Sequence, residues 1–320
     1  MTVPLRQAEN SEAALIVFTL LVPASVGVTL FALLFGSGLP VAAAALLLAS
    51  IGMAGSITHL AKPLRAPTSL RNLRSSWLSR EIAAVIVYWM FVAIWLASEG
   101  AMIAAKAGAL EPAMSATLAT AMPAVSLAAR ALAAVGGAVL LAVIERAYRV
   151  PTRPAWCGHE CLMELAATAL GAGATIYAAI VGWTGWAAVR VDGPWFASNA
   201  APIVAELAAC ALAALIGLIL DILSHKRRYK RLESLREQSD ERIPLTLAHY
   251  GELQRKVRLA WSVETAAVLI AVGTTMLVAG AAAVALLCLA AVLQLIAHAL
   301  QRWIFYELPV QVRWVQRLRK

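Results

Sequence analysis

Long apolar runs separated by shorter polar stretches form the dominant pattern of this chain. Crossing the hydrocarbon core of a membrane takes about 20 residues of helix. Eight runs reach that length, at roughly 12–35, 40–61, 80–98, 126–148, 160–184, 200–223, 259–281 and 283–306. Alanine and leucine dominate them, and no alternation of period two is sustained, which argues against a membrane barrel. The pattern predicts an all-α polytopic membrane protein, a bundle of eight transmembrane helices forming a single domain over residues 1–320.

Composition supports this prediction. The 320 residues are 61% apolar and 14% charged, with a mean hydropathy of +0.76. These values exclude both a soluble globular domain and a disordered chain. The N-terminus has no basic region and the first apolar run has no convincing cleavage site, so we expect that run to be a retained helix and not a signal peptide.

The polar connections between the predicted helices lie on two sides of the membrane, and the two sides differ strongly in charge. The first side has the stretches 36–39, 100–125 and 185–199 and a hairpin near Gly280. The second side has both termini and the connections 62–79, 149–158 and 225–258. Of 27 lysines and arginines, the first side has only three, and the other 24 belong to the second side. We interpret the basic run 226–231 as a topology determinant in contact with membrane lipid, not as a nucleic-acid site.

The same helix order places many polar groups near the second side. His59 ends the second predicted helix and Glu81 begins the third, while His298, Arg302 and Tyr306 recur at intervals of four residues and form one stripe on the last helix. Further polar residues near this side are Glu145, Arg146, Tyr148, Glu164, Asp221, His225 and Glu264. Near the first side, Arg130 and Glu206 are expected to form a buried ion pair. The segment 225–258 is expected to be an extramembrane charged excursion on the membrane surface.

His59 and Glu81 have the chemistry that a quinol site requires. Quinol oxidation releases two electrons and two protons, so each quinone oxygen needs a hydrogen-bond partner and one group must titrate near neutrality. Histidine does so, with an ordinary pKa of about 6.5, and a carboxylate can relay the proton outward. The alternative is that both are interfacial residues at helix ends, with Glu81 stabilised by a helix N-terminus.

The sequence gives little reason to expect a metal centre in this chain. Cys157, His159 and Cys161 form a Cys-x-His-x-Cys run, but it lacks the second ligand pair of zinc or cluster motifs. We therefore interpret these residues as interfacial and expect no metal site. Any iron–sulfur clusters would be held by another subunit. No haem is expected either, because a stacked pair of haems needs histidines near both membrane faces.

Several motifs resemble the membrane-anchor subunits of dimethyl sulfoxide reductase-type molybdoenzymes. Residues 12–19, an acidic residue followed by an aliphatic run ending in Phe-Thr, are similar to the family's opening. Residues 56–66 resemble its Ser-x-x-His-Leu-Gly-x-Pro-x-Arg-Ala motif, with Ala61 in place of glycine. Residues 76–81 match the end of that loop. Three further short motifs resemble the family and occur in its order. They are Arg146 with Tyr148, the Pro-x-Trp at 154–156, and the run 302–306.

This resemblance implies eight helices, no haem, and roles for His59 and Glu81 in quinol handling. It makes Arg65, Arg146, Tyr148, Arg302 and Tyr306 candidates for the quinone pocket or for partner contacts. It also implies two partners, an iron–sulfur subunit with four clusters and a molybdopterin catalytic subunit, which would hold the clusters and the molybdopterin. The quinone would be menaquinone or ubiquinone.

The function that follows is an anchor exchanging electrons between membrane quinone and the iron–sulfur subunit. The charge bias predicts that both termini, the His59/Glu81 site and the partners face the cytoplasm, in the inner membrane. Residues 74–81 also resemble a run in the anchors of cytoplasm-facing sulfite dehydrogenase complexes, which favours quinone reduction. The alternatives are a quinol-oxidising reductase anchor, a secondary transporter and a purely structural anchor. No paired broken helices or internal repeats of the transporter kind are visible.

Overall fold

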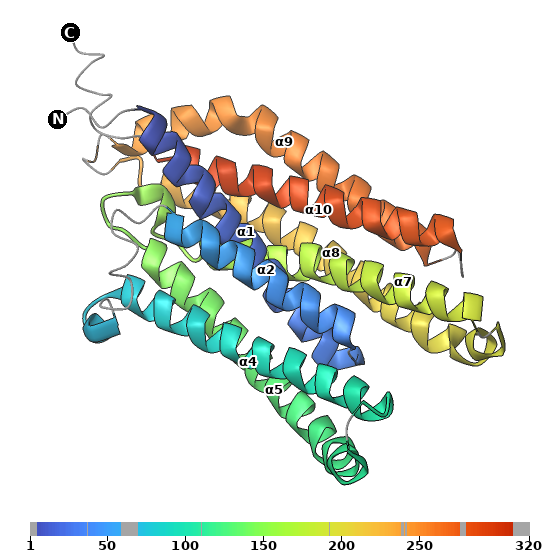
Figure 1. Cartoon of the computed structure of the whole chain (residues 1–320). Coiled ribbons are helices and arrows are strands. Elements are labelled where there is room, and N and C mark those ends of the chain that lie inside the picture. The colour runs from blue at the N-terminus through green and yellow to red at the C-terminus, as the bar shows by residue number, and fades with distance from the viewer. Residues whose placement is uncertain are drawn as a thin grey trace.

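The computed structural model describes residues 5–36, 38–58, 70–109, 111–191, 193–237, 240, 242–275 and 280–309, and the side chains of 5–12, 58 and 188–201 lie outside the described part. Throughout these ranges the regular structure is helical (Figure 1). Eight helical segments of the described residues are long and apolar enough to cross a membrane. The predicted all-α membrane fold is therefore confirmed.

The helices follow one another in chain order. They are α1 (Leu5–Phe35), α2 (Leu39–Thr58), α4 (Trp77–Lys106), α5 (Pro112–Tyr148), α6 (Glu160–Thr168), α7 (Ala174–Val191), α8 (Gly193–Ser234), α9 (Arg242–Thr274) and α10 (Ala281–Glu307). A π-helical turn, η4 (Ala169–Gly173), joins α6 to α7, so that these three elements together form the fifth crossing. Short 3-10 turns are found at η2 (Leu70–Asn72) and η3 (Pro154–Trp156).

Several helices extend well beyond the limits that hydropathy indicated. Much of the stretch 225–258 is helical and continuous with the crossings, because α8 continues to Ser234 and α9 begins at Arg242, and its place outside the membrane stays a prediction. The stretches 100–125 and 185–199 are also mostly helical. The reason is that an apolar run marks the hydrocarbon layer, whereas arginine, lysine, glutamate and leucine continue a helix into the polar layer. Pro244 is tolerated because it lies in the first turn of α9, where no intrahelical N–H bond is lost.

Two crossings form the centre of the bundle. In α1, 67% of the apolar window is buried, and in the fifth crossing 61%, whereas the other six have 39% or less. Helix α1 contacts α2, α5, α6, α7 and α10 and lies in the middle of Figure 1. Helix α1 contacts the π-helical turn at Gly27, which has no side chain. A Cβ built on Gly27 would lie only 1.9 Å from the Ala169 carbonyl oxygen, so no other residue fits there. Small residues at this crossing let the two backbones approach closely.

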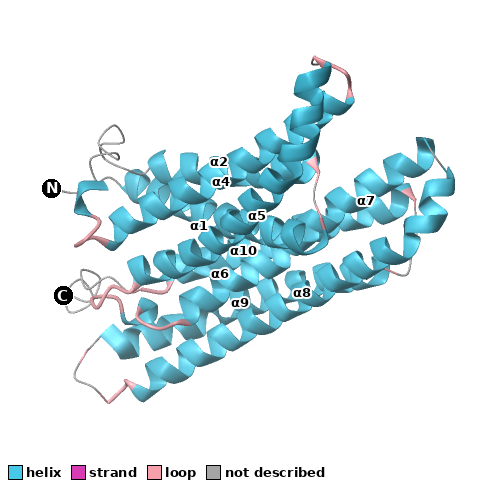
Figure 2. Cartoon of the chain, turned by 90° about the horizontal axis from the view of Figure 1, so that it is seen from below, coloured by secondary structure: helices cyan, strands magenta, loops and turns pink. Residues whose placement is uncertain are grey.

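The remaining helices pack around this centre as hairpins. Helices α4 and α5 pair along one side, and α9 pairs with α10 on the other (Figure 1). Figure 2 shows the α4–α5 hairpin diverging from the α7–α8 hairpin at one end of the bundle. The opposite end contains the start of α1, the loop with η3 and the end of α10. We call this end, where Glu81, Tyr148 and Glu160 lie, the polar end.

Candidate functional site

Glu81 lies in the first turns of α4, at the polar end. Ser76 caps this helix, because its hydroxyl oxygen accepts a hydrogen bond from the Ser79 backbone N–H at 3.3 Å. The cap starts the helix so that Glu81 points inward and is 7% exposed, while Trp77 is 42% exposed. Arg80 lies 4.2 Å from the Trp77 ring and Arg146 lies 5.9 Å from it. Arg146 therefore belongs to the outer surface of the polar end.

A cluster of four aromatic rings lies beside Glu81. Trp156 stacks on Phe305 with ring centres 5.1 Å apart, and its indole N–H donates to the Phe305 carbonyl oxygen at 2.9 Å. Tyr148 and Tyr306 meet these rings edge-on. The Pro-x-Trp loop after α5 is thereby fixed to the end of α10. This packing explains why the two short motifs, far apart in sequence, lie together.

Two tyrosine hydroxyls lie in the same region of the polar end as Glu81. The hydroxyl groups of Tyr148 and Tyr306 are 2.6 Å apart, and the Tyr306 hydroxyl is 3.4 Å from the Thr19 hydroxyl. The Glu81 carboxyl is close enough to Tyr148 to interact with it electrostatically. The two hydroxyls can hydrogen-bond to a ligand oxygen, and a buried carboxyl in the same region can take up or release a proton. Three of the predicted site residues are thus brought together.

Arg302 lies one turn deeper and belongs to a buried ionic cluster. Its Nη2 pairs with a Glu164 oxygen, and the other Glu164 oxygen is 2.5 Å from Arg228 Nη1. All three side chains are 1% exposed. We call them the Glu164 cluster. Such a cluster is stable in an apolar bundle because its opposite charges are paired. Removing one member would leave an uncompensated buried charge on the others.

The predicted stripe on the last helix is confirmed, since His298, Arg302 and Tyr306 are all buried on the inner face of α10. His225 is also internal. Its Nδ1 lies 2.6 Å from the Tyr250 hydroxyl and its Nε2 lies 2.7 Å from Gln301 Oε1. The sequence placed His225 at a helix end, and it is in fact inside α8 because that helix is longer than predicted.

Two candidates, His59 and Arg65, lie outside the described residues. Both are in the loop between α2 and η2, so their relation to Glu81 stays a prediction. The described part of that loop exposes Arg71 and Arg74 at the polar end. The position of Glu81 therefore rests on the structure, and the position of His59 on sequence alone.

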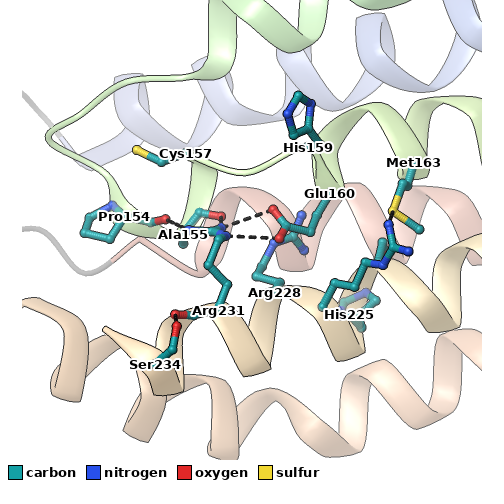
Figure 3. Close-up of polar contacts among 12 residues, drawn as sticks. Pro154, Ala155, Cys157, His159, Glu160, Met163, His225, Arg228, Arg231 and Ser234 are labelled. Atoms are coloured by element: carbon teal, nitrogen blue, oxygen red, sulfur yellow. Dashed lines mark hydrogen bonds and ion pairs between the residues drawn. The ribbon is translucent and has the colours of Figure 1, made fainter. Parts of the chain in front are cut away.

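The Cys-x-His-x-Cys run does not form a converging ligand set. Cys157 Sγ lies 3.2 Å from the Val150 carbonyl oxygen and points away from His159 (Figure 3). His159 is 77% exposed, whereas Cys161 is buried. Partial burial raises the pKa of the Cys157 thiol, which keeps it from being an activated thiolate. The three side chains point to different places.

This loop is instead anchored by Arg231 of α8. Figure 3 shows the guanidinium reaching Glu160, with Nε 3.0 Å from Oε1 and Nη2 3.1 Å from Oε2. Its Nη1 donates to the Pro154 carbonyl oxygen at 2.8 Å. A bidentate pair with an added carbonyl contact fixes both partners in orientation. The η3 loop, and with it Trp156, is held against α8.

The predicted ion pair between Arg130 and Glu206, at the opposite end, is wrong. Arg130 Nη1 donates to the Ala32 carbonyl oxygen at 2.8 Å, and Glu206 interacts with Tyr177. The tyrosine offers Glu206 a nearer hydrogen-bond donor than the arginine does. Glu206 and Tyr177 also line a pocket of about 350 Å³ with Phe35, Gly36, Gly38, Pro40, Val41, Val181 and Thr184.

Eight helices of membrane-crossing length among the described residues, with a buried polar network near one end, define the class of polytopic membrane proteins. The family model described as DMSO reductase anchor subunit (DmsC) matches residues 8–308. The chain belongs to this family and is a membrane anchor of the DMSO reductase type. A comparison with individual curated proteins gives no match.

Proposed function

We propose that this anchor exchanges electrons between the membrane quinone pool and a docked iron–sulfur subunit, with the quinone headgroup bound at the polar end. The observation that carries the proposal is the buried Glu81 carboxyl beside the hydrogen-bonded pair Tyr148 and Tyr306. A site of this kind can accept the protons that quinol releases, or supply those that quinone takes up. His59 is proposed as the second proton-carrying group, on the family resemblance of its loop.

Arg302 is a further candidate for the headgroup. Its Nη2 is engaged by Glu164, whereas Nε and Nη1 are buried without a hydrogen-bond partner among the described residues. Buried guanidinium N–H groups favour an acceptor oxygen. A quinone oxygen has that chemistry, and the adjacent Tyr306 hydroxyl would contact it from the same helix.

The docking surface is proposed to lie on the basic connections of the polar end. Arg65, Arg71 and Arg74 would pair with acidic groups of the iron–sulfur subunit, and the exposed Trp77 ring would supply an apolar anchor. The end of α8 and the start of α9, within 225–258, would border this surface. Charge reversal at Arg71 and Arg74 together should release the partner from membranes. A complex that stays intact in both low and high salt would place the docking surface elsewhere.

The orientation of the complex is proposed from charge. The 24 basic residues of the second side favour a cytoplasmic polar end in the inner membrane. With the resemblance of residues 74–81 to sulfite dehydrogenase anchors, this favours reduction of quinone with electrons from a cytoplasmic substrate such as sulfite. A C-terminal reporter that works only in the cytoplasm should be active. Activity of a periplasmic reporter instead would favour the quinol-oxidising reductase.

The function is tested on the purified complex with the molybdopterin and iron–sulfur subunits present. His59→Ala and Glu81→Gln should each leave the complex assembled but impair quinone-dependent electron flow. Electron transfer between an artificial redox dye and the catalytic subunit should persist in both variants, because it bypasses the anchor. Wild-type quinone turnover in both variants would contradict the site. An intact complex without any quinone-dependent electron flow would indicate a structural anchor.

A further inference from the structure

A second buried polar cluster lies deeper in the bundle, between α8, α9 and α10. His298 Nδ1 is 3.2 Å from Asp221 Oδ2, and His298 Nε2 is 3.9 Å from Glu264 Oε1. Asp221 and Glu264 are 0% exposed and His298 is 1% exposed. We call these three residues the Asp221 cluster. Ionisable groups at such depth are costly in a membrane protein and point to a function.

The polar atoms of this cluster have few partners outside the cluster. Beyond one another, the two carboxyl groups and the two imidazole nitrogens have no hydrogen-bond partner among the described residues. Gln294, one turn before His298 on α10, is 0% exposed and has both amide atoms unpartnered as well. Buried polar groups are normally hydrogen-bonded, so two carboxyl groups in this setting need a bound ion or a shared proton between them.

The π-helical turn accommodates this arrangement. A Cβ built on Gly171 would lie 2.6 Å from His298 Nε2 and 2.9 Å from Gln294 Oε1. Both polar atoms therefore rest against the bare backbone of η4, where a side chain would displace them. Single π-helical turns occur frequently at functional sites. The glycine keeps His298 Nε2 aligned with Gln294 along α10.

Charge counting distinguishes a shared proton from a metal ion. Arg228 and Arg302 contribute +2 nearby, and Glu164 contributes −1, because it pairs with both arginines. His225 is hydrogen-bonded between Tyr250 and Gln301. The Asp221 cluster then balances the region when it carries a single negative charge, which two carboxyl groups beside a neutral imidazole have when they share one proton. A divalent metal ion with all three carboxylates ionised would leave a buried net charge of +1, which is costly.

We propose that Asp221 and Glu264 share one exchangeable proton inside the bundle, and that His298 exchanges it through Nδ1, which lies 3.2 Å from Asp221 Oδ2. Within the pair, the Glu264 carboxyl gives its proton to the Asp221 carboxylate, so that one O–H bond is broken and one is formed. Ser224 lies one helical turn after Asp221 on α8, and its hydroxyl donates to Glu164 Oε1 at 3.4 Å. This hydrogen bond connects the surroundings of Asp221 with the Glu164 cluster.

This shared proton is distinct from the proposed proton-transfer group Glu81 of α4, because Asp221, Glu264 and His298 belong to α8, α9 and α10. Its exchange would connect the middle of the bundle with the polar end through the ionic groups that surround it. The charged and titratable groups that interact with Asp221 are His225 of α8 and Arg302 of α10. Next to these two lie Cys161 and Glu164 of α6 and Arg228 of α8.

The test is infrared spectroscopy of the purified full-length chain in water and in deuterium oxide. A protonated carboxylic acid has a carbonyl stretch that shifts on deuteration. The wild type should show this band, and Glu264→Gln should lose it. Asp221→Asn should also lose it, because removing that negative charge leaves Glu264 to balance the arginines by ionising. The matched control Glu160→Gln should keep it, since Glu160 is ion-paired with Arg231 at 3.0 Å.

The role of His298 is read from the rate of exchange. His298→Gln should keep the band but slow its deuteration by about a hundredfold, the usual contribution of a positioned proton carrier. If Glu264→Gln does not fold, Asp221→Asn reports the same loss without altering Glu264. A band unchanged in both variants would overturn the proposal. One bound transition-metal ion per wild-type chain, lost in Glu264→Gln, would overturn it too, because the occupant would then be a metal.

Discussion

The two buried clusters of the bundle are neighbours with opposite character. In the Glu164 cluster, one carboxylate is held by two arginines, and both of its oxygens are paired. In the Asp221 cluster, two carboxyl groups and a histidine meet at distances of 3.2 and 3.9 Å, without a cation such as arginine between them. The first is suited to a fixed structural role. The second has no such fixed counter-charge, which is the setting that the proposed shared proton requires.

This difference predicts unequal costs of mutation. Glu164→Gln would leave two buried arginines without their counter-charge, which typically costs about 3–5 kcal/mol. We expect a large drop in the thermal unfolding temperature and in the amount of protein recovered from membranes. Glu160→Gln is the matched control, because its partner Arg231 is 25% exposed and can rehydrate. Equal stability of the two variants would break the comparison.

A middle-sized effect is expected at Gly171. The added Cβ of Gly171→Ala would push His298 and Gln294 away from η4, and overpacking of this kind costs about 1–3 kcal/mol. Gly136→Ala is the control, since nothing lies within 4 Å of a Cβ there. Thermal unfolding of both variants measures the difference. If Gly171→Ala is as stable as Gly136→Ala, the histidine is not fixed against the π-helical turn.

The smallest effect is expected at Glu264 itself. In the proposed state its carboxyl is already neutral, so Glu264→Gln replaces one neutral polar group by another of the same shape. The change in unfolding free energy should stay within about 1 kcal/mol, the size of a single net hydrogen bond. A loss as large as that of Glu164→Gln would mean that Glu264 is ionised and paired in the native protein.

The sequence predicted the number of helices because hydropathy reports directly on residues that face lipid or the apolar interior. It did not predict where α8 and α9 end, because polar helix formers continue both helices past the apolar runs. Asp221 and Glu264 were consequently placed near the membrane surface. Their meeting with His298 depends on the register of three helices and on the π-helical turn. Neither of these leaves a periodic signal in a single sequence.

The candidate quinone site was predictable in its residues but not in its contacts. Glu81 was recognised from its loop, while its nearness to Tyr148 depends on the packing of Trp156 against Phe305. Arg302 was predicted beside the same site, and it lies in the Glu164 cluster. The spacing of residues on α10 predicts which of them share a face of that helix. It does not predict their partners, which belong to α6 and α8.

The central claim is that quinone binds at the polar end and not in the pocket of about 350 Å³ at the opposite end. Glu81 and Glu206 lie at opposite ends of the bundle and neither is fully exposed, so Glu81→Gln and Glu206→Gln form a matched pair. Quinone-dependent turnover of the purified complex should fall by about a hundredfold or more in Glu81→Gln, as expected for loss of a proton-transfer group, and should stay near wild type in Glu206→Gln. Loss of turnover in Glu206→Gln with full activity in Glu81→Gln would contradict the account.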